Sequence, residues 1–242
     1  MLLKGKVAFV TGAGRGIGKA IALRFAEEGA SLVVCARTRS PLQAVAETIQ
    51  STGRPCLSEV MNVAAEEQVT NLVGKAIDQF GAIDILVNNA GISNPKPFLQ
   101  TTNTDWAEAI NVNLMGIVFC TRAVLPHMLA RGSGAIVNIA SAAGLRGLPG
   151  SPAYTASKSA AIGFTHALAE ELSGTGVRVN VICPGPIKTE LLDSSAVKDF
   201  VLKNKAHLMP PEDVAGTVLY LASDLSGGLN SQMICVRNSN RW

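Results

Sequence analysis

The stretch VAFVTGAGRGIG, residues 7–18, joins a short apolar run to a loop that contains four glycines. Glycine permits tight backbone turns, and it lets backbone N–H groups approach a pyrophosphate at the N-terminus of a helix. Such a loop is good evidence for a dinucleotide when it lies between the first strand and the first helix of a βαβ unit. The stretch therefore predicts a dinucleotide site, and a glycine-rich turn without a ligand is the alternative.

The residues beyond this loop alternate between short apolar runs and longer helical stretches. The apolar runs are nearly continuous, as in parallel strands that are covered on both faces. Repeated βαβ units of this kind predict an α/β fold with a doubly wound sheet. The predicted strands are Val7–Val10, Ser31–Cys35, Cys56–Met61, Ile83–Val87, Ala135–Ile139 and Val177–Ile182, with Met233–Val236 as a candidate seventh; the predicted helices are Gly16–Glu28, Pro41–Ser51, Ala65–Phe80, Thr104–Arg131 and Ala153–Gly174.

The composition suits one large buried core. Of the 242 residues, 48% are hydrophobic and 16% are charged, which excludes a disordered or fibrous chain. No proline- or glycine-rich linker divides the sequence, so we expect residues 1–242 to form a single domain. The stretch from Lys188 to Met209 is polar and less periodic, and it predicts either a small lid or an ordinary pair of surface helices.

Charge and cysteine content limit the partners and the location. The formal net charge is +3 and the basic residues are scattered, which argues against a nucleic-acid groove. The five cysteines have no metal-like spacing and mostly lie in apolar runs, so we expect buried thiols, no metal site and a reducing compartment. The sequence has no signal-peptide pattern and no apolar run of spanning length, and it predicts a cytoplasmic protein without a membrane partner.

The end of the second predicted strand indicates which nicotinamide cofactor the loop would hold. An NAD site usually carries an Asp or Glu there, which accepts from the ribose 2′-hydroxyl. Here residues 34–39 read VCARTR, without a carboxylate. Arg37 offers a planar cation suited to a 2′-phosphate, and Arg15 in the glycine loop flanks the same place. These features favour NADP(H) over NAD(H).

A phenol and an ammonium stand four residues apart in YTASK, residues 154–158. On a helix this spacing places Tyr154 and Lys158 on one face, one turn apart. A neighbouring cation stabilises a phenolate, which suits tyrosine to acid–base work. The spacing alone is common by chance. However, Ser141 and the stretch NNAG at residues 88–91 each follow a predicted strand, and strand ends of an open α/β sheet meet at the edge that binds ligands.

Six motifs occur together in the order and spacing of the short-chain dehydrogenase/reductase family. They are TGAGRGIG at 11–18, NNAG at 88–91, NVNLMG at 111–116, IVNIAS at 136–141, YTASK at 154–158 and PGPIKT at 184–189. The chain resembles this family from about Lys4 to about Leu225. The resemblance implies a single-domain Rossmann-type sheet of seven mainly parallel strands, flanked by helices on both faces. It also implies assembly as a homotetramer or a homodimer.

The resemblance further implies roles for four catalytic residues. Tyr154 would be the acid or base at the substrate oxygen, and Ser141 would hydrogen-bond that oxygen. Lys158 would bind the nicotinamide ribose and lower the tyrosine pKa, and Asn113 would hold a water that links Lys158 to solvent. The cofactor site implied by the motifs comprises Gly12, Arg15, Gly16, Ile17, Gly18, Arg37, Asn62, Val63, Asn89, Ala90, Gly91, Tyr154, Lys158, Pro184, Gly185, Ile187 and Thr189.

Two stretches depart from the family pattern. Asn62-Val63 follows the third predicted strand where Asp-Val is usual, and the amide is still able to hydrogen-bond an adenine. The stretch after Ser223 lacks the usual Val-Asp-Gly-Gly-like turn near the C-terminus. Because that end often builds a subunit interface and one wall of the substrate cleft, the oligomeric state and that wall stay open.

Three functions remain in competition. The first is NADPH-dependent reduction of a ketone or aldehyde, and the overall pattern is most like the 3-oxoacyl-(acyl-carrier-protein) reductase type. Residues 142–148 are small and apolar and fit many substrates. The second is an NAD-dependent alcohol or sugar dehydrogenase working oxidatively. The third is a non-catalytic nucleotide sensor or scaffold, against which the complete set of Asn113, Ser141, Tyr154 and Lys158 argues.

Overall fold

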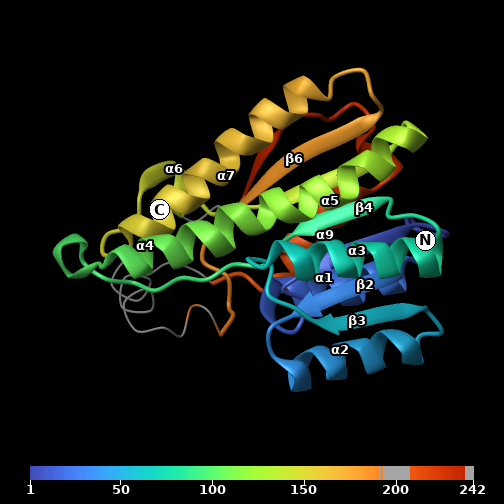
Figure 1. The fold of residues 1–242 in the computed structure, drawn as a ribbon, viewed down its shortest axis with the longest axis horizontal. Coiled ribbons are helices and arrows are strands. Elements are labelled where there is room, and N and C mark those ends of the chain that lie inside the picture. The colour runs from blue at the N-terminus through green and yellow to red at the C-terminus, as the bar shows by residue number, and fades with distance from the viewer. Residues whose placement is uncertain (191, 193–207, 238–242) are drawn as a thin grey trace.

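The fold is a parallel seven-stranded sheet with helices on both faces (Figure 1). A computed structural model describes residues 1–190, 192 and 208–237. The strand order is β3-β2-β1-β4-β5-β6-β7, so the chain winds outward from β1 in one direction and then from β4 in the other. The strands are β1 Val7–Thr11, β2 Ser31–Ala36, β3 Cys56–Val60, β4 Ile85–Asn88, β5 Gly134–Ile139, β6 Val177–Pro184 and β7 Met233–Val236.

The helices form two layers. Residues of α1, α2 and α9 pack in a cluster on one face of the sheet, and residues of α3, α5 and α7 pack on the other (Figure 1). The helices are α1 Gly16–Glu27, α2 Arg39–Ser51, α3 Glu66–Phe80, α4 Asn103–Ile110, α5 Gly116–Arg131, α6 Ala143–Arg146, α7 Pro152–Glu171 and α9 Pro211–Ala222; shorter turns are η1 Phe98–Gln100, η2 Asn111–Met115 and η3 Asp224–Ser226.

The apolar character of the strands follows from this double coverage. In β1, Ala8 and Val10 pack beneath α1, whereas Val7 and Phe9 pack beneath α3 and α5. Every residue of β1 is buried, so both faces of the strand must be apolar. Full burial of a side chain such as Phe9 contributes about 1.5–3 kcal/mol, which stabilises β1 at the centre of the sheet.

The predicted doubly wound architecture is confirmed. Each of the six predicted strands is present with its ends within two residues of the expected positions, and Met233–Val236 forms the seventh, parallel to β6. One prediction needs correction. The stretch Thr104–Arg131 is not a single α-helix, because a π-helical turn, η2, separates α4 from α5.

The predicted lid at residues 188–209 lies mainly outside the described residues. Its two ends are described, and they meet at the base of the segment. Lys188 N–H donates to the Met209 carbonyl at 2.8 Å, and Met209 N–H donates to the Pro186 carbonyl at 3.1 Å. This short bridge anchors the segment beside the end of β6.

Together α4, η2 and α5 make a helical run, Asn103–Arg131, with the length and apolar composition of a membrane span. The sequence had predicted no such run. Length and composition are weak evidence, because the core helices of globular proteins have the same properties. Cys120, Val124 and Met128 of α5 belong to the buried cluster on the sheet. This part of the run is therefore a core helix of the domain.

Candidate active site

A cleft of about 360 Å³ opens at the carboxyl ends of the strands, beside the point where the strand order reverses between β1 and β4. Open α/β sheets bind their ligands at such a switch point. Every residue of the predicted cofactor site lines this cleft, from Gly12 to Thr189. Ser141, Tyr154 and Lys158 line it as well. Asn113 does not, because it is fully buried behind the wall.

The glycine loop and the NNAG loop are bonded together at the floor of the cleft. The Thr11 hydroxyl accepts from the backbone N–H groups of Asn89 and Ala90, each at 3.0 Å. The Asn89 side-chain amide donates to the Thr11 carbonyl at 2.9 Å. A Cβ on Gly18 would collide with the Gly12 carbonyl and with the Asn89 amide, so this helix–loop approach requires glycine.

Two exposed arginines stand where the glycine loop meets the end of β2. Arg15 immediately precedes α1, Arg37 immediately follows β2, and both line the cleft. Within the described residues, neither guanidinium belongs to an ion pair. The first turn of α1 has no acidic residue that would oppose an anion. The arginines and the start of α1 therefore suit a phosphate group, with the Glu190 carboxylate lying nearby beside Gly16.

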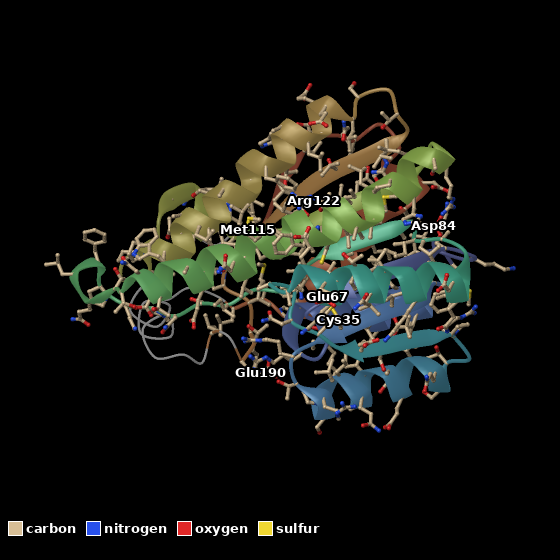
Figure 2. The ribbon with its side chains drawn as sticks, viewed as in Figure 1. Cys35, Glu67, Asp84, Met115, Arg122 and Glu190 are labelled. Atoms are coloured by element: carbon tan, nitrogen blue, oxygen red, sulfur yellow. The ribbon has the colours of Figure 1, made fainter. Side chains whose placement is uncertain are left out.

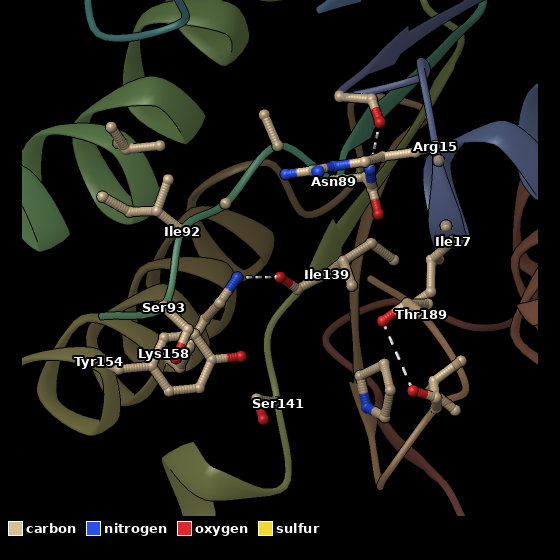
Figure 3. A pocket seen from close by; sticks show the side chains of 18 of the residues that line it. Arg15, Ile17, Asn89, Ile92, Ser93, Ile139, Ser141, Tyr154, Lys158 and Thr189 are labelled. Carbon is tan, nitrogen blue, oxygen red and sulfur yellow. Dashed lines mark hydrogen bonds between the residues drawn. The ribbon is translucent and has the colours of Figure 1, made fainter. Parts of the chain in front are cut away.

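Tyr154, Ser141 and Lys158 stand together on the opposite wall (Figure 3). Tyr154 and Lys158 are one turn apart on α7, and Ser141 follows β5. The Lys158 Nζ atom lies 5.9 Å from the centre of the Tyr154 ring and donates to the Ile139 carbonyl at 2.8 Å. A Cβ on Gly91 would lie 3.3 Å from Lys158 Nζ, so β4, β5 and α7 converge at this point.

A family model described as short chain dehydrogenase matches residues 6–199. The chain belongs to the short-chain dehydrogenase family. It is therefore an oxidoreductase. The conclusion agrees with the fold and with the cleft, because the matched residues contain the glycine loop, Ser141, Tyr154 and Lys158.

Relatives of this short-chain dehydrogenase match nearly the whole chain. The (2S)-[(R)-hydroxy(phenyl)methyl]succinyl-CoA dehydrogenase subunit BbsD of Thauera aromatica is 40% identical over 98% of this chain and 96% of that protein. The 3-oxoacyl-[acyl-carrier-protein] reductase of Synechocystis is 42% identical over 92% of this chain and 91% of that protein.

Solved structures agree with the fold. Levodione reductase has a TM-score of 0.91 and 30% identity, with 97% of both chains covered. A short chain dehydrogenase from Mycobacterium paratuberculosis bound to NAD has the same TM-score and identity, with 98% of both chains covered.

The cleft of this short-chain dehydrogenase fits a nicotinamide dinucleotide. The glycine loop packs closely against its neighbours at the floor of the cleft, since a Cβ on Gly12 would lie 2.9 Å from Ala90 Cα and one on Gly16 would lie 3.1 Å from Thr189 Cγ2. Glycines at these positions leave the loop backbone uncovered toward the cleft that it lines. Backbone N–H groups at the start of α1 and the arginine pair suit phosphates at one end. The Lys158 ammonium suits ribose hydroxyls at the other.

Asn62, which replaces the usual family Asp, keeps an ordered turn at the cleft edge. Its Oδ1 accepts from Ala64 N–H at 3.1 Å, and its own N–H donates to Gln68 Oε1 at 2.9 Å. Within the described residues, its Nδ2 donor makes no hydrogen bond. The predicted hydrogen bond of this amide with an adenine stays a prediction.

Burial controls the proton affinities of the catalytic pair. It raises the pKa of Tyr154, and a hydrogen bond with Ser141 opposes this effect. Burial lowers the pKa of Lys158 to about 8. The resemblance implied that Lys158 would lower the pKa of Tyr154. In this structure the net pKa is raised, because burial outweighs the hydrogen bond with Ser141. The lowering of the Tyr154 pKa by Lys158 stays a prediction.

Asn113 positions the loop after β4. Its Oδ1 accepts from Ile92 N–H at 2.8 Å, and its Nδ2 donates to the Ile92 carbonyl at 3.0 Å and to Ser157 Oγ at 2.9 Å. The π turn contains Asn113, and π turns inside helices often occur at functional sites. The side chain thereby ties the loop to α7 next to Lys158. Its predicted role in holding a water remains a prediction.

The substrate end of the cleft contains residues that were not predicted. Residues 142–148 were interpreted as small and apolar, but Arg146 among them lines the cleft. A charged residue between Ser141 and Tyr154 was the available signal. Ser93 lies two residues beyond the NNAG loop, and it lines the cleft next to Tyr154 (Figure 3). The further lining residues of the cleft include Ile92, Val112, Leu148 and Leu192. Glu190 also lines it, and its Oε2 atom would lie 3.8 Å from a Cβ on Gly16 of the glycine loop.

Proposed function

We propose that this short-chain dehydrogenase reduces a ketone or aldehyde to an alcohol with NADPH. The observation that carries the proposal is the placement of Tyr154 and Ser141 on one wall of a cleft that has Arg15 and Arg37 at its other end. A carbonyl reduction needs a positioned proton donor, and a 2′-phosphate needs a planar cation. A sensor or scaffold would need no such acid–base group.

Ser141, Tyr154 and Lys158 have separate roles in the proposed reaction. The bound nicotinamide supplies the hydride. Ser141 and Tyr154 hydrogen-bond the substrate oxygen, which holds the carbonyl in place and stabilises the charge that develops on it. Tyr154 then donates its proton to that oxygen. Lys158 binds the nicotinamide ribose, and with a pKa of about 8 its ammonium is suited to return a proton to Tyr154 near neutral pH.

Substitution of the phenol tests the reaction. Tyr154→Phe should lower kcat for carbonyl reduction by about 10²–10⁴-fold, because positioned acid–base groups contribute in that range. Binding of NADPH, measured by quenching of protein fluorescence, should change little. The matched control is Tyr220→Phe, which removes a hydroxyl from an exposed residue of α9. Undiminished reduction by Tyr154→Phe would refute the mechanism.

The cofactor preference is a separate test. Arg37→Asp should raise KM for NADPH by about tenfold to a hundredfold, since charge-assisted hydrogen bonds contribute about 1.5–3 kcal/mol. It should leave KM for NADH unchanged or lower, because a carboxylate accepts from a 2′-hydroxyl. Arg39→Asp, two residues along, is the control. The alternative is an NAD-dependent dehydrogenase, which the NAD-bound structural relative favours; a wild-type preference for NADH would establish it.

The relatives suggest a substrate class. We propose a β-ketoacyl thioester as the first substrate to test, because several relatives are 3-oxoacyl-[acyl-carrier-protein] reductases. A panel with diketones and sugar-derived ketones, followed by NADPH absorbance, separates this class from the others. We further propose that the enzyme works in the cytoplasm as a homotetramer or homodimer, without nucleic-acid or membrane partners.

A further inference from the structure

Cys183 and Cys235 lie directly opposite each other on neighbouring parallel strands. Cys183 is in β6, and Cys235 is its register partner in β7. Neighbouring strands lie about 4.7–4.9 Å apart. The Cα atoms of a disulfide lie about 4.4–6.8 Å apart. The backbone spacing of this pair therefore suits a disulfide, although both thiols are free here.

Both side chains point to the same face of the sheet. Successive residues of a strand alternate between faces, and register partners of parallel strands share one. Ile182 and Ile234, one residue earlier in each strand, both pack in the cluster beneath α1 and α9. Cys183 therefore faces the other side, where it packs with Ala140 and with Ile162 of α7. Cys235 faces that side too.

The two thiols differ in their access to solvent. Cys183 is fully buried, whereas Cys235 is exposed because β7 is the outermost strand of the sheet. All five cysteines lie within the described residues, and Cys235 alone is exposed among them. In the single chain, a dissolved oxidant therefore reaches Cys235 more readily than the buried Cys183.

Cys183 also contacts the wall of the active site. A hydrogen bond from the Ser141 backbone N–H to its sulfur lowers the pKa of the Cys183 thiol, although burial raises that pKa more. In the proposed function, Ser141 holds the substrate oxygen. A sulfur drawn toward β7 would give up the Ser141 contact and would shift that residue.

We propose that Cys183 and Cys235 are a site of reversible oxidation, and that their disulfide joins β6 to β7 and slows turnover by displacing Ser141. The effect on turnover rests on the proposed function, whereas the bond itself does not. Directly opposed residues of a sheet place their Cβ atoms slightly farther apart than a relaxed disulfide prefers, so the edge strand must move inward. Such strained bonds are easily reduced, which makes the link reversible.

A hydroperoxide is the oxidant that the chemistry requires. The Cys235 thiolate attacks the O–O bond, so that its sulfur becomes a sulfenic acid and the peroxide leaves as alcohol or water. The Cys183 sulfur then attacks the sulfenic sulfur, and its proton leaves with the hydroxide as water. Two thiols are thus oxidised and one peroxide is reduced. A small dithiol restores both thiols by exchange and becomes a disulfide itself.

The bond is tested without any substrate. The full-length protein is treated with hydrogen peroxide, its remaining thiols are alkylated, and its peptides are mapped by mass spectrometry. We expect one intramolecular link between the peptides of Cys183 and Cys235, which dithiothreitol removes. An overoxidised Cys235 without a link, or a Cys235–Cys235 link between two chains, would overturn the proposal.

The effect on turnover is tested with matched variants. Oxidised wild type should lose about tenfold or more of its activity, since loss of one oxyanion donor has at least that effect, and dithiothreitol should restore it. Cys235→Ser should be active and insensitive to the same treatment, whereas Cys56→Ser, which removes a half-buried thiol on β3, should stay sensitive. Equal loss of activity by Cys235→Ser, or a mapped link with unchanged turnover, would refute the coupling to Ser141. Protein that reduces no ketone even before oxidation would instead refute the proposed function, and the mapped bond would stand.

Discussion

Lys158 carries an ammonium into a place that water hardly reaches. The residue is 4% exposed, and its Nζ atom donates to the Ile139 carbonyl at 2.8 Å. Burial disfavours the charged form, which is why the pKa falls from 10.5 to about 8. Each pKa unit corresponds to 1.36 kcal/mol, so the charged form is disfavoured by roughly 3 kcal/mol in the folded protein without cofactor.

This shift predicts how stability depends on pH. Between about pH 8 and about pH 10.5 the folded protein has released the Lys158 proton while the unfolded chain still holds it, so the free energy of unfolding rises with pH. We expect the free energy of unfolding of wild type to rise relative to that of Lys158→Met by up to about 3 kcal/mol across this window. Urea unfolding without cofactor measures this difference. Comparison with Lys158→Met removes the titrations that both proteins share.

The control for this experiment is Lys75→Met. Lys75 is an exposed lysine that pairs with Glu59 on the surface. Its variant should follow wild type in parallel across the same pH range. A constant difference between wild type and Lys158→Met would contradict the depressed pKa.

Among the individual site residues, the sequence predicted those that belong to a motif. Tyr154, Lys158 and Ser141 were found because their spacing and their strand ends fix where they lie. Ser93 and Arg146 were missed for a physical reason, since Ser93 lies in a loop and Arg146 ends the single-turn helix α6, and neither stretch is long enough for periodicity to tell which side chains face a cleft. A fold shows the direction of such side chains, and a single sequence does not.

Among the elements, the short helix α6 rests directly on α7. A Cβ on Gly144 would lie 2.9 Å from the Lys158 carbonyl carbon and 3.0 Å from Ser159 N. The Ser159 hydroxyl donates to the Gly144 carbonyl at 2.6 Å, which closes the contact. Because α6 follows Ser141 and α7 carries Tyr154 and Lys158, this contact sets the distance between the two catalytic walls.

Widening the contact should therefore impair catalysis. Gly144→Ala places a methyl group against the backbone of α7, and overpacking of this kind costs about 1–3 kcal/mol. We expect kcat for carbonyl reduction to fall about tenfold or more, because small displacements of catalytic groups have large effects. NADPH affinity, measured by fluorescence titration, should change less than kcat.

The comparison for that variant is Gly163→Ala in the middle of α7. Gly163 is exposed, and a Cβ there meets nothing within 4 Å. Alanine stabilises a helix interior by about 0.5–1 kcal/mol relative to glycine, so this variant should melt slightly higher with full activity. If both variants behave alike, the α6–α7 contact does not control the site.

The π turn shows the limit of sequence reasoning about elements. The hydrogen bonds of a π turn such as Asn111–Met115 span five residues instead of the four of an α-helix, yet the apolar positions on both sides continue a helical pattern. Periodicity therefore predicted one continuous helix from Thr104 to Arg131. The π turn includes Asn113, whose side chain is hydrogen-bonded to Ile92 and Ser157, and these bonds join residues far apart in the sequence.

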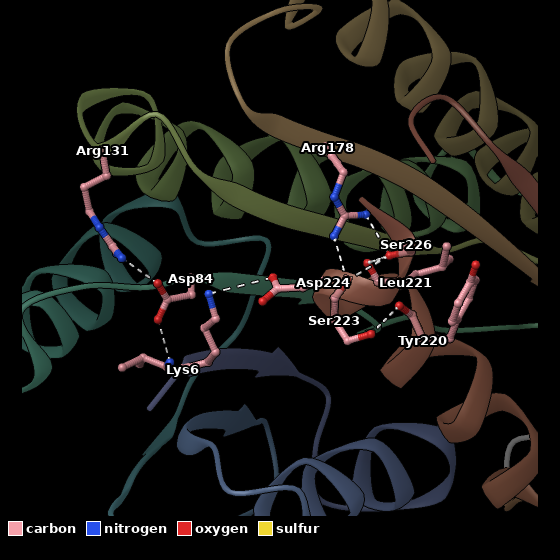
Figure 4. A network of polar contacts seen from close by, with 10 residues as sticks. Lys6, Asp84, Arg131, Arg178, Tyr220, Leu221, Ser223, Asp224 and Ser226 are labelled. Atoms are coloured by element: carbon pink, nitrogen blue, oxygen red, sulfur yellow. Dashed lines mark hydrogen bonds and ion pairs between the residues drawn. The ribbon is translucent and has the colours of Figure 1, made fainter. Parts of the chain in front are cut away.

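In the molecule as a whole, the two ends of the strands have different roles. Glu190 lies toward the carboxyl ends, where the cleft is, and Asp84 lies at the opposite, amino ends (Figure 2). There the Asp84 carboxylate accepts from Val7 N–H at 2.7 Å and from Arg131 at 2.6 Å, and Arg178 of β6 donates to the Ser223 carbonyl and to Ser226 (Figure 4). These bonds join strand starts to helix ends, far from the chemistry.

Removal of Asp84 should lower stability and spare catalysis. Asp84→Ala leaves Val7 N–H without its partner, which costs about 1–3 kcal/mol. We expect a lower urea midpoint with an unchanged kcat for the folded fraction. Glu59→Ala breaks an exposed pair with Lys75 and should cost at most about 1 kcal/mol. A lower kcat in fully folded Asp84→Ala would contradict the view that the amino ends of the strands serve stability and the carboxyl ends serve catalysis.

The sequence predicted the topology better than the site because few arrangements satisfy its pattern. Apolar runs such as Val7–Val10 and Ile83–Val87 need cover on both faces, and parallel strands need right-handed crossovers. Together these rules predict the doubly wound sheet. The contacts that shape the substrate end come from Arg146 and from the bridge of Ile187 to Met209, whose partners no local pattern names.

The central place of β1 also has a consequence for synthesis on the ribosome. Ala8 pairs with Leu32 on one side and with Ile85 on the other, and Ile85 is made 77 residues after Ala8. At about 5–20 residues per second, one edge of an apolar strand waits roughly 4–15 seconds for its partner. Unpaired apolar edges are sites of aggregation. The nascent chain is therefore most in need of chaperone protection before β4 emerges.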